Sequence, residues 1–385
     1  MALIPTYRER EKTMYKLRSD DEKTDNLPAA RTRKRLSKIT WTERTWSPLI
    51  GCTKDSTGCK YCYAEREVTQ RWSKNPKSIW YGRNFADVLC RPEALDEPLR
   101  WRKAQRIFVC PRADLFHDDV SDEFLDQVFG VMWACLYQRD ETAGHVFQLL
   151  TKRADRMCDY LLQDRREQWA RAAVDVGGGI NPDGLYDQTL YWEGPHPRIW
   201  LGVSAENQAA ADRRVTRLLQ TPASIRWVSV EPLIGPVDLT NIDPPDLGDG
   251  REYSGIDALS VANRPIRGVL DWVVSGGESG PRPMHPDWAR SLRDQCAEAH
   301  VPFLHKQHGE YIQVYDRDRD DPDLKRCAEI ERKFPQGRWL NLAGGYGFSG
   351  ERVIYVDRVG MRKNASRLLD GVLHDEYPAT LGEAV

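Results

Sequence analysis

The sequence predicts an α/β fold, built on a partial or closed (β/α) barrel of about six to seven parallel strands. Seven short apolar runs, rich in β-branched and aromatic residues, recur between residues 45 and 305. Amphipathic segments with helical periodicity separate several of these runs. Such alternation is typical of a parallel sheet that is covered on both faces. Seven strands in one series favour a single barrel over two separate halves.

The predicted elements follow one another in a regular order. The candidate strands are residues 45–50, 106–110, 145–150, 198–203, 225–230, 270–275 and 302–305. The candidate helices are residues 122–138, 209–219 and 287–299, and Pro286 with Asp287 suits the start of the last one.

Three regions are expected along the chain. Residues 1–38 are charged and poor in apolar periodicity, which predicts a flexible basic N-terminal arm. Residues 39–312 are expected to form the barrel with its loop insertions. Residues 313–385 are expected to form a C-terminal extension or a lid.

Composition limits the possible partners. The 385 residues carry a formal net charge of −2, so any contact with nucleic acid has to be local, for example through the basic residues 31–35. No run of 18 apolar residues and no apolar leader segment occurs, so we expect no membrane partner. Nine cysteines without the framework of a secreted protein favour a reducing, cytoplasmic environment.

Three cysteines within eleven residues, Cys52, Cys59 and Cys62, are the most informative motif. The polar residues between them indicate a surface loop. Structural zinc and ordinary iron–sulfur clusters each take four protein ligands, so three thiolates leave one position for an outside ligand. We therefore favour a [4Fe–4S] cluster. Two alternatives stay open: a zinc site completed by His or Asp from elsewhere, and three packed thiols without a metal.

Polar side chains follow six of the predicted strands at their carboxyl ends. Active sites of α/β barrels lie at this edge, so the pattern predicts a shared polar cavity. These residues are Arg112 and Asp114, then Thr151, Lys152 and Arg153, then Ser204, Glu206 and Asn207, then Glu231, then Glu278 and Ser279, and finally Lys306, Gln307 and Glu310. The candidate catalytic residues among them are Lys152, Arg153, Glu231, Lys306 and Gln307.

Two glycines, Gly276 and Gly277, come directly after the sixth strand and precede Glu278. Paired glycines let a ligand approach the backbone closely, and a carboxylate can accept hydrogen bonds from an ammonium group. The motif is also compatible with an ordinary turn. A ligand-binding loop and a plain turn are therefore both retained.

The cysteine loop, with Tyr61 just before Cys62, resembles the cluster motif of the radical S-adenosylmethionine (SAM) superfamily. The resemblance implies a TIM-barrel-like core, a [4Fe–4S] cluster on Cys52, Cys59 and Cys62, and SAM on the open iron. It also implies that Tyr61 packs near the SAM adenine. The SAM-binding candidates are Tyr61, Arg112, Asp114, Ser204, Glu206, Gly276, Gly277 and Glu278.

More narrowly, several blocks resemble an uncharacterised bacteriophage and bacterial family named after phage gene products thirty-seven and sixty-eight. The likeness covers roughly residues 39–312, with a weaker tail near residues 367–378. The matching blocks are residues 51–65, Asp114-Leu-Phe-His117, Leu150-Thr-Lys-Arg153, Trp200-Leu-Gly-Val-Ser204 with Glu206 and Asn207, Ser229-Val-Glu-Pro-Leu233, residues 272–280, and Lys306 and Gln307 with Gly309 and Glu310.

Two features depart from the superfamily pattern. Six residues separate Cys52 from Cys59, where three are usual. The Gly-Gly-Glu motif normally follows the second strand, whereas Gly276 to Glu278 follows the sixth. The contact to the SAM amino group is therefore assigned either to Glu278 or to the region of Arg112 and Asp114.

The function that the resemblance implies is reductive cleavage of SAM to a 5′-deoxyadenosyl radical, which then modifies a substrate. The substrate class we expect is a nucleobase or nucleotide, free or within DNA or RNA. The implied electron donor is a flavodoxin or a ferredoxin, and the implied location is the cytoplasm of a bacterial or phage-infected host cell. Two alternatives are kept: a SAM-independent nucleic-acid-binding metalloprotein, and a barrel-fold hydrolase with a structural zinc.

Overall fold

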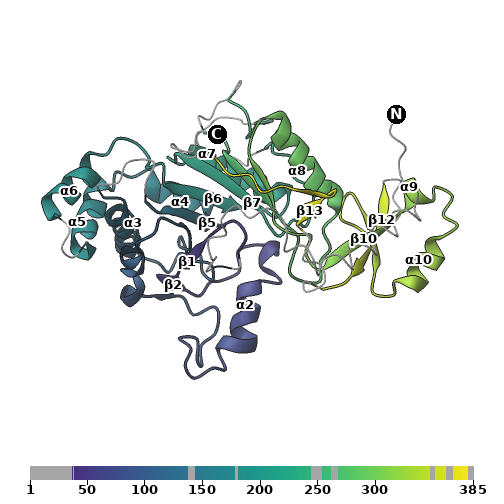
Figure 1. The fold of residues 1–385 in the computed structure, drawn as a ribbon, viewed down its shortest axis with the longest axis horizontal. Coiled ribbons are helices and arrows are strands. Elements are labelled where there is room, and N and C mark those ends of the chain that lie inside the picture. Colours follow the sequence, from purple (N-terminus) through teal and green to yellow (C-terminus); the bar gives the residue numbers. More distant parts are fainter. Residues whose placement is uncertain are drawn as a thin grey trace.

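The computed structural model describes residues 37, 39–137, 144–177, 181–243, 254–261, 268–346, 352–360 and 367–379. Its centre is a parallel sheet of seven strands in the order β1-β4-β5-β6-β7-β8-β9. The sheet curls into a half-barrel, with β1 and β9 at its two edges (Figure 1). The predicted α/β class is thereby confirmed, in its partial-barrel form. The predicted N-terminal arm lies outside the described residues apart from Ser37.

The strands of this sheet agree closely with the predicted runs. They are β1 Arg44–Trp46, β4 Arg106–Val109, β5 Val146–Thr151, β6 Ile199–Ser204, β7 Ile225–Val230, β8 Trp272–Ser275 and β9 Phe303–His305. All neighbouring pairs are parallel.

The first predicted strand, residues 45–50, is wrong in its second half. The chain leaves the sheet after Trp46, and residues 49–50 form the separate strand β2 (Leu49–Ile50), which pairs with the antiparallel β3 (Leu89–Cys90). Pro48 lies between the two strands, and it has no N–H group to donate to a continuing ladder. An apolar run alone does not show this break.

Helices cover the outer face of the sheet and the ends of the molecule. They are α2 Tyr63–Glu67, α3 Asp122–Leu136, α4 Ala154–Leu161, α5 Arg166–Val176, α6 Pro182–Tyr191, α7 Gln208–Gln220, α8 Pro286–Glu298, α9 Arg317–Asp320 and α10 Cys327–Lys333. Shorter turns of other helix types are η1 Thr57–Cys59, η2 Val68–Trp72, η3 Pro92–Ala94 and η4 Glu97–Arg100. The three predicted helices correspond to α3, α7 and α8.

Helix starts carry the capping side chains that the sequence offers. The Ser121 side chain accepts a hydrogen bond from Phe124 N at the start of α3, and the Asn207 side chain accepts one from Ala210 N at the start of α7. Pro286 occupies the first turn of α8, where a missing N–H group costs nothing. These caps fix where the chain turns from each strand end into its helix.

Two apolar layers hold the half-barrel together. The larger layer lies between the sheet and the outer helices and includes Val128, Leu201 and Leu292. The smaller layer fills the concave interior with Trp41, Trp200, Trp227, Trp272 and their neighbours. The ring centroids of Trp227 and Trp272 are 5.2 Å apart, and those of Trp41 and Trp227 are 5.1 Å apart.

A glycine makes room for this interior cluster. Gly202 lies on β6 beside Trp227 of β7, and an added Cβ at Gly202 would stand 2.4 Å from the indole ring. No side chain fits at that distance. A small residue on β6 is therefore required for the indole to occupy the interior.

The chain returns to the half-barrel near its C-terminus. Residues 368–373 form the small hairpin β13 (Leu368–Leu369) and β14 (Val372–Leu373). The following residues run antiparallel beside β9, with Asp375 paired to Leu304, and Trp272 Nε1 donates to Glu376 O at 2.8 Å. Tyr377 packs on Trp272, and its hydroxyl donates to Thr40 O at 3.3 Å. This tail therefore covers the interior at the amino-terminal ends of the strands.

Much of the predicted C-terminal extension forms a small unit of its own. It is an antiparallel sheet, β10 Tyr311–Asp316, β12 Val353–Arg358 and β11 Arg338–Asn341, with α9 and α10 beside it (Figure 1). Its core includes Tyr315, Trp339 and Tyr355. Within the part of the chain that the structure describes, no helix has both the length and the apolar character needed to cross a membrane.

Candidate functional site

A cavity of about 450 Å³ opens at the carboxyl ends of the sheet strands. Its floor is apolar and includes Trp41, Phe108 and Leu150, while polar side chains form its walls. The predicted site residues that line it are Cys52, Cys59, Tyr61, Cys62, Arg112, Asp114, Thr151, Lys152, Arg153, Ser204, Glu231, Gly277, Glu278, Ser279 and Lys306. Segments that are distant in the sequence are thereby brought together.

The three cysteines lie on one loop over this cavity. The loop begins at Gly51, whose φ is +90° and where a Cβ would stand 2.2 Å from Asp87 O, so only glycine fits. Cys59 ends the turn η1, and Cys62 directly precedes α2. All three thiols are half-buried. The structure thus places the predicted ligand set on a single wall of the cavity.

Glu206 holds the middle of the cysteine loop by a hydrogen bond to the backbone. Its Oε1 accepts a hydrogen bond from Gly58 N at 3.2 Å, and its Oε2 lies 3.0 Å from Lys152 Nζ and 2.8 Å from Arg214 Nη1. Burial by itself raises the pKa of Glu206, but the charges of Lys152 and Arg214 and the hydrogen bond from Arg214 outweigh it and lower the pKa to about 2. Glu206 is therefore ionised, and its carboxylate holds the cysteine loop through Gly58 N.

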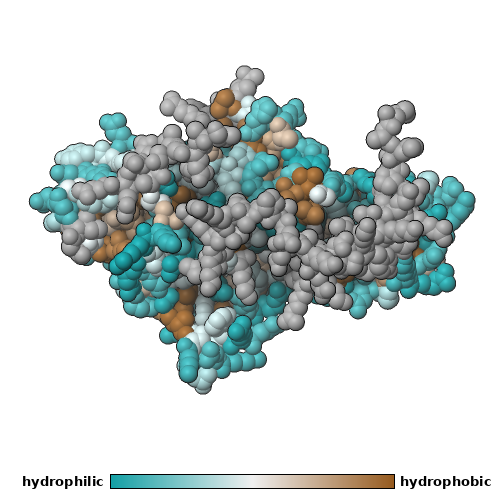
Figure 2. Space-filling view, viewed as in Figure 1, coloured by the Kyte–Doolittle hydropathy of each residue, from teal (hydrophilic) through white to brown (hydrophobic). Residues whose placement is uncertain are grey.

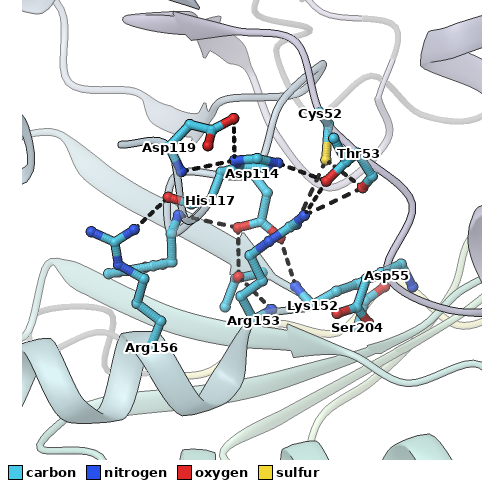
Figure 3. Close-up of polar contacts among 12 residues, drawn as sticks. Cys52, Thr53, Asp55, Asp114, His117, Asp119, Lys152, Arg153, Arg156 and Ser204 are labelled. Atoms are coloured by element: carbon cyan, nitrogen blue, oxygen red, sulfur yellow. Dashed lines mark hydrogen bonds and ion pairs between the residues drawn. The ribbon is translucent and has the colours of Figure 1, made fainter. Parts of the chain in front are cut away.

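A second network links the cysteine loop to the ends of β4 and β5 (Figure 3). Arg153 Nη1 lies 3.2 Å from Asp114 Oδ2 and 3.7 Å from Cys52 Sγ, and Nη2 donates to Thr53 Oγ1 at 2.9 Å. Thr53 Oγ1 also lies 2.7 Å from His117 Nε2. Arg153 therefore fixes the first cysteine relative to the barrel.

Both carboxylate oxygens of Asp114 accept hydrogen bonds within this network. Its Oδ1 accepts from Thr151 Oγ1 at 2.6 Å and from Phe116 N at 3.1 Å, and its Oδ2 accepts from Lys152 N at 3.0 Å. Burial and then the charge of Asp114 raise the pKa of the Cys52 thiol to about 12. Without a bound cation, Cys52 is therefore a neutral thiol.

A charge pair also lines the cavity, after β7 and β9. Lys306 Nζ lies 2.8 Å from Glu231 Oε1 and 2.9 Å from Oε2, and Gln307 Nε2 donates to the same Oε1 at 3.3 Å. Ser204 Oγ donates to Glu231 O at 3.1 Å and lines the cavity. Four of the predicted polar residues therefore form one group.

Glu278 is paired with a residue that the sequence reasoning did not single out. Arg282 Nε lies 3.1 Å from Oε1 and 3.0 Å from Oε2 of Glu278. Arg282 Nη1 also donates to Thr57 O at 3.0 Å, and its guanidinium lies 5.2 Å from the centre of the Tyr61 ring. The Glu278–Arg282 pair is thus a third support of the cysteine loop, through Thr57 and Tyr61.

The two glycines before Glu278 are explained by packing. An added Cβ at Gly277 would stand 2.3 Å from His308 O, and one at Gly276 would stand 3.2 Å from the carboxyl carbon of Glu231. Gly276, Glu206 and Gln307 do not line the cavity. Arg112 is at the rim, where it is paired with Glu67 at 3.0 Å.

Several residues of the site escaped the sequence reasoning. These are Thr53, His117, Arg214, Ser229 and Arg282. A signal existed for Arg214, because it occupies the apolar stripe of α7 that includes Ala211, Val215 and Leu218. A cation on such a stripe indicates a buried partner.

The donor set fits an iron–sulfur cluster with three protein thiolates. Among the described residues, no three His, Cys, Asp or Glu side chains converge on a point where one metal ion could bind. Thiolates of a [4Fe–4S] cluster bind separate iron atoms, so they need not converge on a point. Cys52, Cys59 and Cys62 share one cavity wall, with Arg153 beside them to offset thiolate charge.

Comparison with known proteins identifies a family. A family model described as "Protein of unknown function (DUF5131)" matches residues 36–378. No curated protein and no solved structure matches the chain.

Proposed function

The chain belongs to the DUF5131 family, the phage gene-product family that its sequence blocks resemble, and on that premise we propose that it is a radical SAM-type iron–sulfur enzyme. One observation carries the proposal. Three cysteines of a single loop and polar side chains from six strand ends line the same cavity at the carboxyl edge of a half-barrel. Catalytic groups of α/β barrels are found at this edge.

Cys52, Cys59 and Cys62 would hold a [4Fe–4S] cluster and leave one iron for the amino and carboxylate groups of SAM. When bound, the cluster and SAM supply a carbon radical that removes hydrogen from a substrate, with a flavodoxin or ferredoxin as electron donor. The protein contributes binding, orientation and electrostatics.

The chain's own residues have separate tasks in this proposal. Arg153 donates to Cys52 Sγ, which stabilises the thiolate form of a ligand. The apolar floor around Trp41 and Phe108 limits water around the reacting groups. Ser204 and the pair of Glu231 with Lys306 offer hydrogen-bonding groups to SAM or substrate.

Two carboxylates are in place to meet the SAM ammonium, Glu231 and Glu278. Each already holds a resident cation, Lys306 and Arg282 respectively. A ligand ammonium would therefore compete with a lysine or an arginine at either site. With SAM bound, the ion pair that opens to admit the ligand ammonium is the one whose lysine or arginine can bind another hydrogen-bond acceptor.

The proposal is tested by anaerobic reconstitution with iron and sulfide. We expect a brown protein that loses its iron in Cys52→Ala, Cys59→Ala and Cys62→Ala, and that forms 5′-deoxyadenosine from SAM under strong reductant. Retention of a full cluster by all three variants, or failure of cluster-replete protein to cleave SAM, contradicts the proposal.

Cys110 supplies the sharpest control. It also lines the cavity, but it is 3% exposed and packs in the apolar layer between sheet and helices. We expect Cys110→Ala to keep its iron. If Cys110→Ala loses metal as completely as the other three and the protein stays colourless with zinc, the site is a closed four-thiolate zinc site.

A further inference from the structure

Residues 60–83 form a projection beside the mouth of the cavity, here called the α2 projection. It contains α2 and η2 and extends away from the half-barrel (Figure 1). Its base contributes Tyr61, Tyr63 and Arg66 to the cavity wall. Trp80 and Val68 are buried with Ile50 in a small apolar cluster, which holds the projection to the body. A ligand bound along the projection therefore lies next to the mouth of the cavity.

The α2 projection is strongly basic, unlike the chain as a whole. It contains six Lys or Arg residues and two Glu residues, while the whole chain has a net charge of −2. Both acids are neutralised from outside, because Glu65 pairs with Lys54 and Glu67 with Arg112. The projection seen in Figure 2 is mainly hydrophilic, with paler side chains among the polar ones.

Four of these cations are available to an outside partner. Arg71, Lys74, Lys77 and Arg83 are exposed, and within the described residues none of them has a carboxylate partner. The cations of the cavity are different, because Lys152, Arg153 and Lys306 are paired with Glu206, Asp114 and Glu231. These three cations of the cavity are thus neutralised by carboxylates, whereas the four exposed cations of the projection remain available to a partner.

Exposed aromatic rings accompany this charge. Tyr61 and Tyr81 are 37% and 57% exposed. The Arg71 guanidinium lies 5.1 Å from the centre of the Trp72 ring, and Lys60 Nζ lies 5.5 Å from the centre of the Tyr61 ring. Basic side chains interleaved with aromatic faces are the features that bind single-stranded nucleic acid, through phosphate pairing and base stacking.

We infer that the α2 projection binds single-stranded nucleic acid and presents one nucleotide of it to the cavity. This inference rests on the proposed function and names the substrate class of the same site. A single strand fits better than a duplex, because stacking on Tyr81 requires free base faces and a 450 Å³ cavity admits single nucleotides only. An acidic electron-donor protein would use the charge but not the aromatic rings.

The test measures fluorescence anisotropy of labelled twelve-nucleotide DNA and RNA single strands, and of a duplex, with the full chain at several salt concentrations. The variant Arg71→Ala/Lys74→Ala/Lys77→Ala/Arg83→Ala should bind the single strands at least tenfold more weakly. Its log–log salt slope should be shallower by about 0.7 for each phosphate that the variant no longer neutralises. Tyr81→Ala should weaken binding severalfold without changing the slope.

A matched control removes four exposed cations from the distal unit, Lys325, Arg326, Arg332 and Lys333. It has the same change in net charge, and we expect wild-type binding. Equal weakening in both fourfold variants, binding as tight to duplex as to single strand, or unchanged binding in the α2 variant overturns the inference. The same follows if the α2 variant loses only its response to a flavodoxin.

The inference and the proposed function fail in distinguishable ways. The fourfold α2 variant retains Cys52, Cys59 and Cys62, so its iron content, colour and melting temperature should equal those of the wild type. Loss of oligonucleotide binding with an intact cluster supports the inference. An intact cluster together with unaltered oligonucleotide binding refutes it and leaves the proposed function standing.

Discussion

Glu206 Oε2 and Arg214 Nη1 lie 2.8 Å apart, and both side chains are 1% exposed. The pair joins β6 and α7 to the cysteine loop, because Glu206 also accepts from Gly58 N and Arg214 also pairs with Asp55. Breaking a buried pair by removing one partner leaves an uncompensated charge, which costs more than the pair contributes. The support of the proposed cluster therefore depends on a residue outside the cavity.

Glu206→Gln should lower the free energy of unfolding by about 3–5 kcal/mol, because Arg214 and Lys152 lose their shared carboxylate. Urea denaturation of the metal-free protein under reducing conditions measures this change. The control is Glu167→Gln, which breaks the exposed pair with Arg171 and should cost at most about 0.5 kcal/mol. Similar losses in the two variants would show that the buried network does not support the fold.

Acid should destabilise the protein through buried histidines. Burial, and then the charge of Arg198, lower the pKa of His196 to about 4. Between pH 6.5 and pH 4 the unfolded state therefore binds more protons at His196 than the folded state does. The contribution of His196 to the stability is fully present above pH 6.5 and is lost as the pH falls towards 4. We expect a loss of about 1–3 kcal/mol from this residue, measured as the unfolding free energy at about pH 7 and about pH 4.5.

His196→Asn should reduce that pH dependence, because asparagine can still accept the hydrogen bond that His196 Nδ1 receives from Arg198 N. His300→Asn, at an exposed position, is the matched control for the substitution itself. An unchanged slope in His196→Asn would falsify the assignment to His196.

The C-terminal tail should contribute to the stability of the barrel. Tyr377 packs on Trp272 at 5.2 Å between ring centres, and the guanidinium of Arg106 lies 4.0 Å from the centre of its ring. Tyr377→Ala should lower the unfolding free energy by about 2–3 kcal/mol, less than for a fully buried ring. Val372→Ala, at an exposed position of the preceding hairpin, should change it by less than about 0.5 kcal/mol. Thermal denaturation of both variants provides the comparison.

The pair of Lys306 and Glu231 should serve the reaction rather than the cluster. Lys306→Met should lower the rate of SAM cleavage at least tenfold, because a positioned charge in the cavity is lost. Its iron content should not change. Lys306→Met also leaves the Glu231 carboxylate without its cation and should lower the stability. Lys306→Met/Glu231→Gln removes both charges and should recover that stability without recovering the rate. Lys325→Met, at an exposed site, is the control, and full activity of Lys306→Met would remove Lys306 from the site.

The sequence determined the elements of the half-barrel with little help from tertiary structure. All seven strands and three of the outer helices follow from periodicity and capping residues, because a strand buried on both faces reads as a short apolar run. Among the strands the error is residues 45–50, which arose because Trp46 and Leu49 are both apolar although they belong to different sheets. The helices α4, α5 and α6 were not predicted. The polar residues at the strand ends likewise predicted the cavity, because the carboxyl ends of parallel strands lie at the same edge of the sheet.

Only the tertiary structure decided which of the polar residues face the cavity and which support it. Asp114 and Glu206 have the same chemistry in the sequence, yet each is bound to a cation from a distant element, Arg153 and Lys152 respectively. Glu278, by contrast, pairs with Arg282, four residues further along the chain. Lys152 and Glu206 are 54 positions apart, and no local pattern encodes such a pair. The sequence specifies local conformation through nearest neighbours, whereas pairing of charges depends on distances that exist only after the sheet has curled.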